Sequence, residues 1–264
     1  MSKKAFLIVL AALLAVILLV SCDEKPGAND VDYIPITDST TVLTGGKAYC
    51  LYKDTCVEIN ERITIDGSDP VTLKLFDGSD LDAMKGITVG ENQTLIIEGD
   101  TTMNMTTRLY ADASKVSGAA GIGGFNENET CGTIIIQGLI NVVAFGGADA
   151  AGIGGAKGGH GGHVELNLKN KICTVMATGG ENGAGIGGGL NGKGGDVIYR
   201  CGDIYTNGYE GIGLGLYGTD LGTITLATEA EVYVGPDQTH FEVYDNSNYQ
   251  SNRDCFMRLK DPNY

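Results

Sequence analysis

The hexapeptide Ala-Ala-Gly-Ile-Gly-Gly at residues 119–124 decides the fold of this chain, because it recurs at nearly regular intervals. It returns unchanged at 150–155 and as Gly-Ala-Gly-Ile-Gly-Gly at 183–188, and a decayed copy, Tyr-Glu-Gly-Ile-Gly-Leu, occupies 209–214. The isoleucines of the four copies lie 31, 33 and 26 residues apart, a period typical of repeat architectures. They are Ile122, Ile153, Ile186 and Ile212.

The segments between the glycine clusters favour β-strands. Residues 132–138, 141–145 and 163–168 are rich in β-branched and aliphatic side chains and are bounded by glycine or turn residues. The intervals contain such segments and turns but no amphipathic helix, which excludes tetratricopeptide, ankyrin and HEAT arrays. The sequence therefore predicts a β-solenoid with one coil per repeat.

Glycine is concentrated at the repeated corner: of the 41 glycines, 32 lie between Gly118 and Gly222. They show no strict every-third spacing, which excludes collagen. In a solenoid, coils stack about 4.8 Å apart, so a corner residue with a Cβ atom would meet its own copies above and below. Glycine avoids this contact and also tolerates positive φ. We expect the four isoleucines to form one interior column.

The N-terminal part shows similar strand patterns with less glycine. Residues 57–65, 71–76, 87–89 and 94–97 alternate or run apolar between turns, which indicates earlier and less regular coils. We expect about six to eight coils within residues 39–234. An open solenoid end would expose strand edges, so the polar residues 235–264 are assigned to a C-terminal cap.

The N-terminus has the pattern of an export signal. Lys3 and Lys4 precede an uncharged apolar run at 6–20, which is short for a membrane span. Leu-Val-Ser-Cys at 19–22 resembles the lipobox of bacterial lipoproteins, which implies cleavage of residues 1–21 and lipidation of Cys22. Ordinary secretion is the alternative. Residues 22–38 are acidic and contain two prolines, as expected of a flexible tether.

The net charge restricts the possible binding partners, and the cysteines leave the cross-linking of the chain open. The formal net charge is −15, and it becomes −17 once Lys3 and Lys4 are removed. A strongly acidic surface repels phosphate backbones, so nucleic-acid binding is not expected. Six cysteines remain after Cys22, and disulfides and buried thiols stay open as alternatives.

The stretch from Val71 to Gly99, followed by the Ala-Gly-Ile-Gly-Gly units, resembles a group of bacterial surface proteins with "GAGIGGG" repeats. Those proteins look like right-handed parallel β-helices of the pectate-lyase type, and the resemblance covers residues 57–234. It implies an all-β fold. Some related β-helix modules bind plant polysaccharides, which suggests the same ligand class here.

Few residues point to catalysis. Gly-His-Gly at 159–161 resembles a polygalacturonase motif, but no aspartate pair precedes His160 for acid and base work. No nucleophile elbow, zinc-protease motif or phosphate loop occurs. Residues 192–199 match most of one calcium nonapeptide, with Asp196 as the acidic ligand, although single copies are common by chance in glycine-rich sequence. The pair His160 and His163 is a second metal candidate, and solvated turn residues are the alternative.

Tyrosine is the commonest aromatic residue, with twelve tyrosines against six phenylalanines and no tryptophan. A group in the late coils would form an amphipathic platform for sugar rings if its members shared one outer face. Scattered structural tyrosines are the alternative. The group consists of Tyr199, Tyr205, Tyr209 and Tyr217.

These observations predict a bacterial envelope lipoprotein, exported and anchored to the membrane by lipid, with a surface-facing β-helix. We expect non-enzymatic binding or adhesion, with polysaccharide as the ligand and no cofactor other than the calcium candidate. A polysaccharide lyase or hydrolase and a purely structural scaffold are the alternatives.

Overall fold

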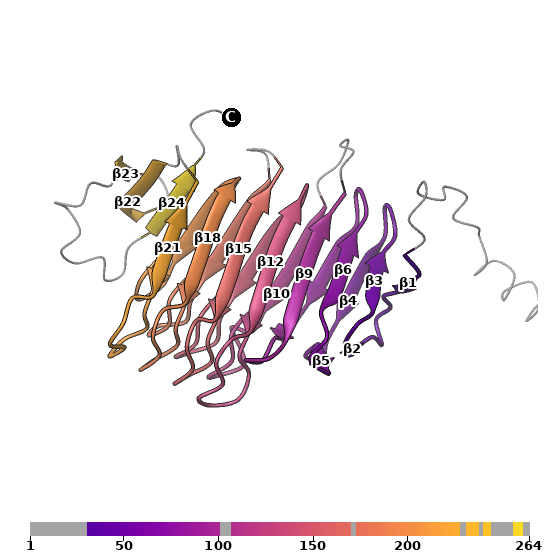
Figure 1. Ribbon diagram of the computed structural model, residues 1–264, viewed down its shortest axis with the longest axis horizontal. Helices are drawn as coiled ribbons and strands as arrows, with labels where there is room; N and C mark the ends of the chain where they lie inside the picture. Colours follow the sequence, from indigo (N-terminus) through magenta and orange to yellow (C-terminus); the bar gives the residue numbers. More distant parts are fainter. Residues whose placement is uncertain are drawn as a thin grey trace, which may run out of the picture. The chain divides into compact units, whose positions relative to one another are not determined.

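The computed structural model describes residues 31–100, 107–169, 173–227, 231–237, 240–243 and 256–260. These residues contain β-strands and no helix, so none of them forms a helix able to cross a membrane (Figure 1). The chain divides into two compact units, Met1–Asp32 and Tyr33–Tyr264. The predicted signal segment and Cys22 lie outside the described residues.

The first sheet has eight parallel strands that follow one another in chain order (Figure 1). One strand is contributed by each successive repeat, and partners are about one repeat apart, as in the pairing of Ile134 with Val164. The strands are β1 (Tyr33–Pro35), β3 (Ala48–Leu51), β6 (Val71–Leu75), β9 (Thr94–Gly99), β12 (Thr133–Gly138), β15 (His163–Leu168), β18 (Asp196–Cys201) and β21 (Thr223–Leu226).

The second sheet begins with six parallel strands and ends with three antiparallel ones. The parallel strands are β4 (Cys56–Ile59), β7 (Asp80–Ala83), β10 (Arg108–Asp112), β13 (Asn141–Phe145), β16 (Thr174–Thr178) and β19 (Asp203–Asn207). The antiparallel strands are β24 (Phe256–Lys260), β22 (Glu231–Asp237) and β23 (His240–Val243).

The third sheet consists of the repeated corners. Its strands have two residues each: β8 (Ile87–Thr88), β11 (Ile122–Gly123), β14 (Ile153–Gly154), β17 (Ile186–Gly187) and β20 (Ile212–Gly213). A short pair, β2 (Val42–Thr44) with β5 (Thr64–Asp66), precedes it, and the bridge from Ile63 to Ile87 joins the two regions. From β9 to β21 the chain visits the three sheets in the same order in every repeat.

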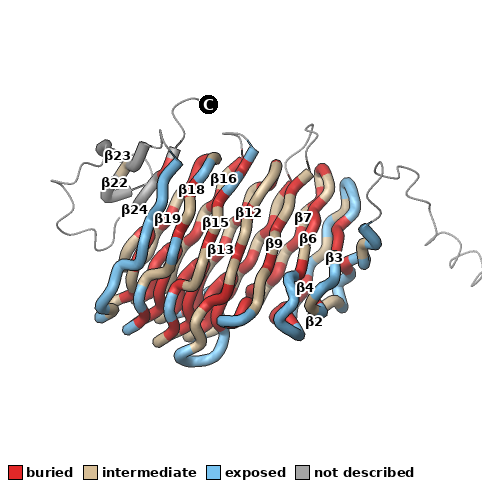
Figure 2. Tube along the Cα trace, in the orientation of Figure 1, coloured by how far each residue is buried: buried red, intermediate tan, exposed pale blue. Residues whose placement is uncertain are grey.

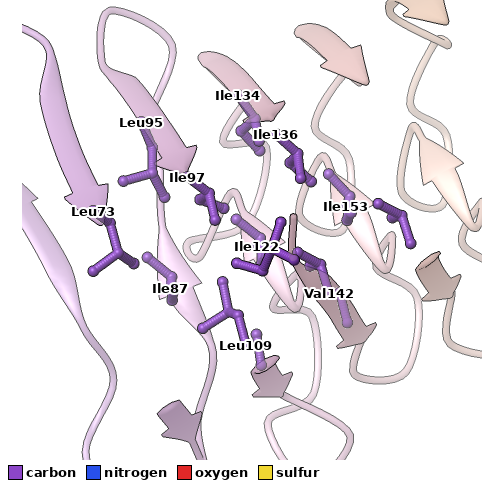
Figure 3. Close-up of a cluster of buried hydrophobic side chains, with 14 of the residues drawn as sticks. Leu73, Ile87, Leu95, Ile97, Leu109, Ile122, Ile134, Ile136, Val142 and Ile153 are labelled. Carbon is purple, nitrogen blue, oxygen red and sulfur yellow. The ribbon is translucent and has the colours of Figure 1, made fainter. Parts of the chain in front are cut away.

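The core lies between the three sheets. Along most strands buried and partly exposed residues alternate, as the banding in Figure 2 shows, because successive side chains point to opposite faces. In the interior, Leu73, Leu95 and Ile134 lie near Ile87 and Ile122 (Figure 3). The isoleucines of the four repeats pair with one another in register and are at most 2 % exposed.

The corner glycines make this stacking feasible. Gly154 has φ +140°, and a Cβ atom there would collide with the carbonyl oxygen of Gly187 in the next repeat. Only glycine adopts this conformation without strain. The backbone therefore continues the ladder through the corner, where the N–H of Ile153 donates to the carbonyl of Gly185 at 2.9 Å.

Two predicted boundaries move. β1 pairs with β3, and Ile36 is buried with its N–H donating to the carbonyl of Cys50, so residues 33–36 pack against the sheet and are not part of a tether. At the other end, β22 pairs with the antiparallel strand β24 and not with β19, so the parallel ladder of the second sheet ends at β19, before residue 235. The all-β arrangement of parallel sheets in chain order is compatible with a β-solenoid.

Candidate functional site

The four tyrosines predicted to form a platform do not share one surface. Tyr199 lies on β18 with its side chain 1 % exposed, and its hydroxyl donates to the carbonyl of Gly202 at 2.8 Å. Tyr205 is on the second sheet, Tyr209 is in the loop before β20, and Tyr217 is in the following loop and 73 % exposed. The prediction is wrong for Tyr199, because strand alternation directs its side chain into the core.

The outer face of the second sheet instead carries a continuous apolar strip. Tyr110, Val143, Met176 and Tyr205 occupy one register position on β10, β13, β16 and β19. Phe145 lies two residues along β13, with its ring centroid 5.8 Å from that of Tyr110. We call these five half-buried side chains the aromatic strip. At a strand spacing of about 4.8 Å, the strip extends about 14 Å across the sheet.

Both tyrosines of the strip are held at their polar ends. The hydroxyl of Tyr110 donates to Asp112 Oδ2 at 3.2 Å, and the hydroxyl of Tyr205 donates to Asp203 Oδ2 at 3.0 Å. In each case the carboxylate lies two residues away on the same strand and therefore on the same face. The hydrogen bonds restrict the ring orientations, so that each ring offers an apolar face beside a polar edge.

An arginine and two aspartates adjoin Tyr110. Arg108 donates from Nε and Nη2 to the two carboxylate oxygens of Asp80, both at 2.8 Å, and Nη2 also reaches Asp82 Oδ1 at 2.9 Å. The guanidinium carbon lies 5.3 Å from the centroid of the Tyr110 ring. The bidentate pairing fixes the position of the guanidinium, and the guanidinium in turn packs against the tyrosine.

The pKa values of these groups reflect burial, hydrogen bonding and neighbouring charges. Burial raises the pKa of Asp82, Arg108 partly offsets this effect, and the neighbouring charges of Asp80 and Glu58 raise the pKa further. The pKa of Tyr110 is raised by burial and then by Asp112. The hydrogen bond to Asp80 raises the pKa of Arg108. The strip therefore lies beside several carboxylates and one permanent cation.

A separate groove of about 520 Å³ follows the turns that precede the first-sheet strands. It brings together His160, His163 and Asp196, which the sequence singled out in two different motifs. The backbone N–H of Lys193 donates to His160 Nδ1 at 3.1 Å, and Thr223 Oγ1 donates to Asp196 Oδ1 at 2.6 Å. The groove has both polar and apolar surface, and part of its lining is glycine backbone, which allows close approach of a ligand.

Within the described ranges, no three His, Cys, Asp or Glu side chains lie together in a way that could hold a metal ion. The calcium site at Asp196 and the metal pair His160 and His163 therefore remain predictions from sequence. Cys22 lies outside the described residues, and its lipidation likewise remains a prediction.

Sequence reasoning missed most of the aromatic strip. Tyr110, Val143, Met176 and Tyr205 are 33, 33 and 29 residues apart, close to the period of the corner isoleucines, and this spacing is the signal that would have found them. Comparison of the chain with protein-family models, curated proteins and solved structures finds no match. The functional argument therefore depends on the chemistry of the site itself.

Proposed function

We propose that this chain is a non-enzymatic module of the bacterial cell envelope that binds polysaccharide through the aromatic strip. The observation that carries the proposal is the alignment of two carboxylate-held tyrosines with Phe145 on one outer sheet face. A sugar ring has apolar faces and a polar rim, and it fits such a surface by stacking on the ring and bonding at its edge.

The geometry favours an extended polymer over a single sugar. The strip crosses four neighbouring strands, and its members repeat at the strand spacing of about 4.8 Å. A long chain lying across the strands would contact several rings at once. Once one sugar unit is bound, the other units of the same polymer are held close to the remaining rings. Several weak contacts would therefore combine into a higher affinity.

The proposed fold is a right-handed parallel β-helix with a C-terminal cap. Its support is the fixed order in which each repeat visits the three sheets, together with the general rule that parallel crossovers are right-handed. The eight strands of the first sheet agree with six to eight coils plus terminal turns. The antiparallel strands β22, β23 and β24 would close the end of the second sheet.

The envelope location depends on Cys22. We propose that it carries a lipid and presents the β-helix at the cell surface, for which the apolar run at 6–20 and the Leu-Val-Ser-Cys sequence are the support. Mass spectrometry of the N-terminal peptide from an expressing bacterium measures the lipid directly. A peptide that retains residues 1–21, or one that begins at Cys22 without lipid, would contradict the anchor.

The binding test removes the rings of the strip. We expect a glycan array, run on residues 31–264 with and without calcium, to identify a polymer ligand. For that ligand, Tyr110→Ala and Tyr205→Ala should each weaken binding about tenfold, equivalent to about 1.4 kcal/mol. Calorimetric titration measures the loss, and thermal unfolding checks that each variant is folded.

Tyr217→Ala is the matched control, because Tyr217 is 73 % exposed and lies outside the strip. Its affinity should equal that of the unchanged protein. Equal losses in all three variants, or no loss in the two strip variants, would contradict binding at the strip. Recovery of shortened polymer after incubation would favour the cleaving enzyme instead.

A further inference from the structure

We infer that the aromatic strip selects a polysaccharide that carries ammonium groups, of the class formed by linked glucosamine units. The inference rests on the proposed function and assigns its ligand by charge. It is carried by the distribution of carboxylates around Tyr110, on the outer face of β4, β7 and β10.

Four carboxylates surround this end of the strip. The register places Glu58 beside Asp82, and Asp82 beside Tyr110, on three successive strands. Asp80 pairs with Arg108 in the adjacent outward position, and Asp112 lies two residues beyond Tyr110 on β10. All four carboxylates therefore lie within about 10 Å of the tyrosine, close to one screening length at physiological ionic strength.

One guanidinium does not neutralise this group. Arg108 engages both oxygens of Asp80 and shares one nitrogen with Asp82. The hydrogen-bond partners of Asp112 are neutral donors, namely the Tyr110 hydroxyl and the backbone N–H of Ser114 at 2.8 Å. Glu58 likewise accepts from a neutral donor, the amide of Asn60 at 3.0 Å. The local balance is four acidic groups against one basic group.

This balance discriminates among polysaccharides. A polyuronate laid on the strip would bring its carboxylates against Asp82, Asp112 and Glu58, and the net charge of −15 would repel it at longer range. A neutral polymer would gain only stacking and hydrogen bonds. An ammonium group gains attraction to the carboxylates, and it also interacts favourably with the face of the Phe145 ring.

The experiment compares two hexamers that share one backbone with a third hexamer of opposite charge. Hexamers of glucosamine and of N-acetylglucosamine differ only in whether the nitrogen is charged or acylated, and a galacturonate hexamer supplies the opposite charge. The comparison is made near pH 6, where amines are largely protonated. We expect the glucosamine hexamer to bind about tenfold tighter than its acetylated form, with no binding of galacturonate.

Asp112→Asn is the sharpest variant, because the amide oxygen of Asn still accepts from the Tyr110 hydroxyl while the charge is lost. The substitution should weaken binding of the glucosamine hexamer about fivefold. The affinity for the acetylated hexamer should stay within about twofold of its original value. Asp220→Asn, an exposed aspartate in the separate groove, is the matched control and should change neither. Hexalysine should bind the unchanged protein less tightly than the glucosamine hexamer does. Its affinity should be the same for the Tyr205→Ala variant.

The outcomes separate this inference from the proposed function. Equal or tighter binding of the acetylated or galacturonate hexamer, with Tyr110→Ala still harmful, overturns the charge selection and leaves polysaccharide binding intact. Failure of all sugars, on the hexamers and on the array, overturns both. Preferential binding of hexalysine that depends on Tyr205 would show that the face takes a basic peptide, which also overturns the inference.

Discussion

The repeats between Gly118 and Gly222 and the strands before Gly99 pack their corners in two different ways. In the later coils the corner is Gly-Ile-Gly, and each corner lies against a nearly identical one. In the earlier region Thr88 pairs with Gly123, so a residue with a branched side chain occupies the register position of a glycine. Thr88 is not in the left-handed region, whereas Gly123 has φ +136°.

Arg62 accounts for the difference. Its side chain is buried where the glycine corner begins, and Nε donates to Thr88 Oγ1 at 2.7 Å. Its Nη1 donates to the carbonyls of Lys85 at 2.6 Å and Ala120 at 2.9 Å, and Nη2 to that of Ile87 at 3.1 Å. Burial lowers the pKa of Arg62 to about 10. The guanidinium therefore donates to three backbone carbonyls and one hydroxyl where the two kinds of corner meet.

The comparison shows that glycine is required by repetition itself. A corner stacked between copies has no room for a Cβ atom, as the collision of Gly154 with Gly187 shows. The corner at Thr88 is not stacked between identical copies, and the space beside it is filled by the Arg62 side chain. This interpretation is tested by variants that place a side chain at a glycine corner or glycine at the earlier corner.

The largest effect is expected at the repeated corner. Gly154→Ala forces alanine into φ +140° and against the backbone of the next repeat. Strain and collision together should destabilise the fold by more than about 4 kcal/mol or prevent folding. Thr88→Gly, at the corresponding position of the earlier corner, should cost only about 1 kcal/mol. Urea unfolding followed by circular dichroism measures both, and a Gly154→Ala protein within 1 kcal/mol of the original would contradict the corner model.

A smaller effect is expected at Arg62. Replacement by methionine keeps the buried volume similar but leaves several buried carbonyl groups without their donor, which should cost about 2–4 kcal/mol. Lys85→Met, which removes a neighbouring cation whose 2.7 Å ion pair with Glu61 is exposed, should cost less than about 1 kcal/mol. Similar losses in both variants would show that Arg62 acts only as a surface charge.

The smallest effect concerns the buried thiol of the glycine-rich coils. Burial raises the pKa of Cys131 to about 12. Because the unfolded thiol ionises near pH 8.5–9, the folded state loses relative stability as pH rises from there towards 12. Compared with Cys131→Ala, the unchanged protein should lose about 1.5–2 kcal/mol between pH 8 and pH 10, at about 1.4 kcal/mol per unit of pH above the unfolded pKa. A stability difference that stays constant over this range would contradict the buried, protonated thiol.

Much of the strand pattern could be predicted from the sequence, because glycine clusters separate strongly β-prone runs. The predicted segment 132–138 corresponds to β12, and 163–168 coincides with β15. The run 57–65 is interrupted, since Arg62 turns into the corner between β4 and β5. Strand alternation places Tyr199 on the same inward face as Val197, so its burial could have been predicted. The closeness of the four tyrosines in the sequence suggested a common outer surface instead.

The aromatic strip was harder to predict. Its two tyrosines lie on β10 and β19. The β10 sequence, Arg-Leu-Tyr-Ala-Asp, has no β-branched residue, whereas the β19 sequence, Asp-Ile-Tyr-Thr-Asn, has two, and both end in turn-forming residues. The strand pattern of β10 is therefore weak, and that of β19 covers only three residues. Both become strands because the neighbouring coils supply hydrogen-bond partners in register, and this tertiary effect is absent from a local reading of the sequence.

Distances between spin labels along one outward column of the second sheet test the stacked architecture most directly. One label at Glu58 is combined with a second at Val143, Met176 or Tyr205, attached through an unnatural amino acid so that the cysteines remain. The account predicts mean separations of about 14, 19 and 24 Å, a rise of about 4.8 Å per strand. Separations that do not increase in this order, or that rise by the length of a whole extended repeat, would contradict parallel coils stacked in register.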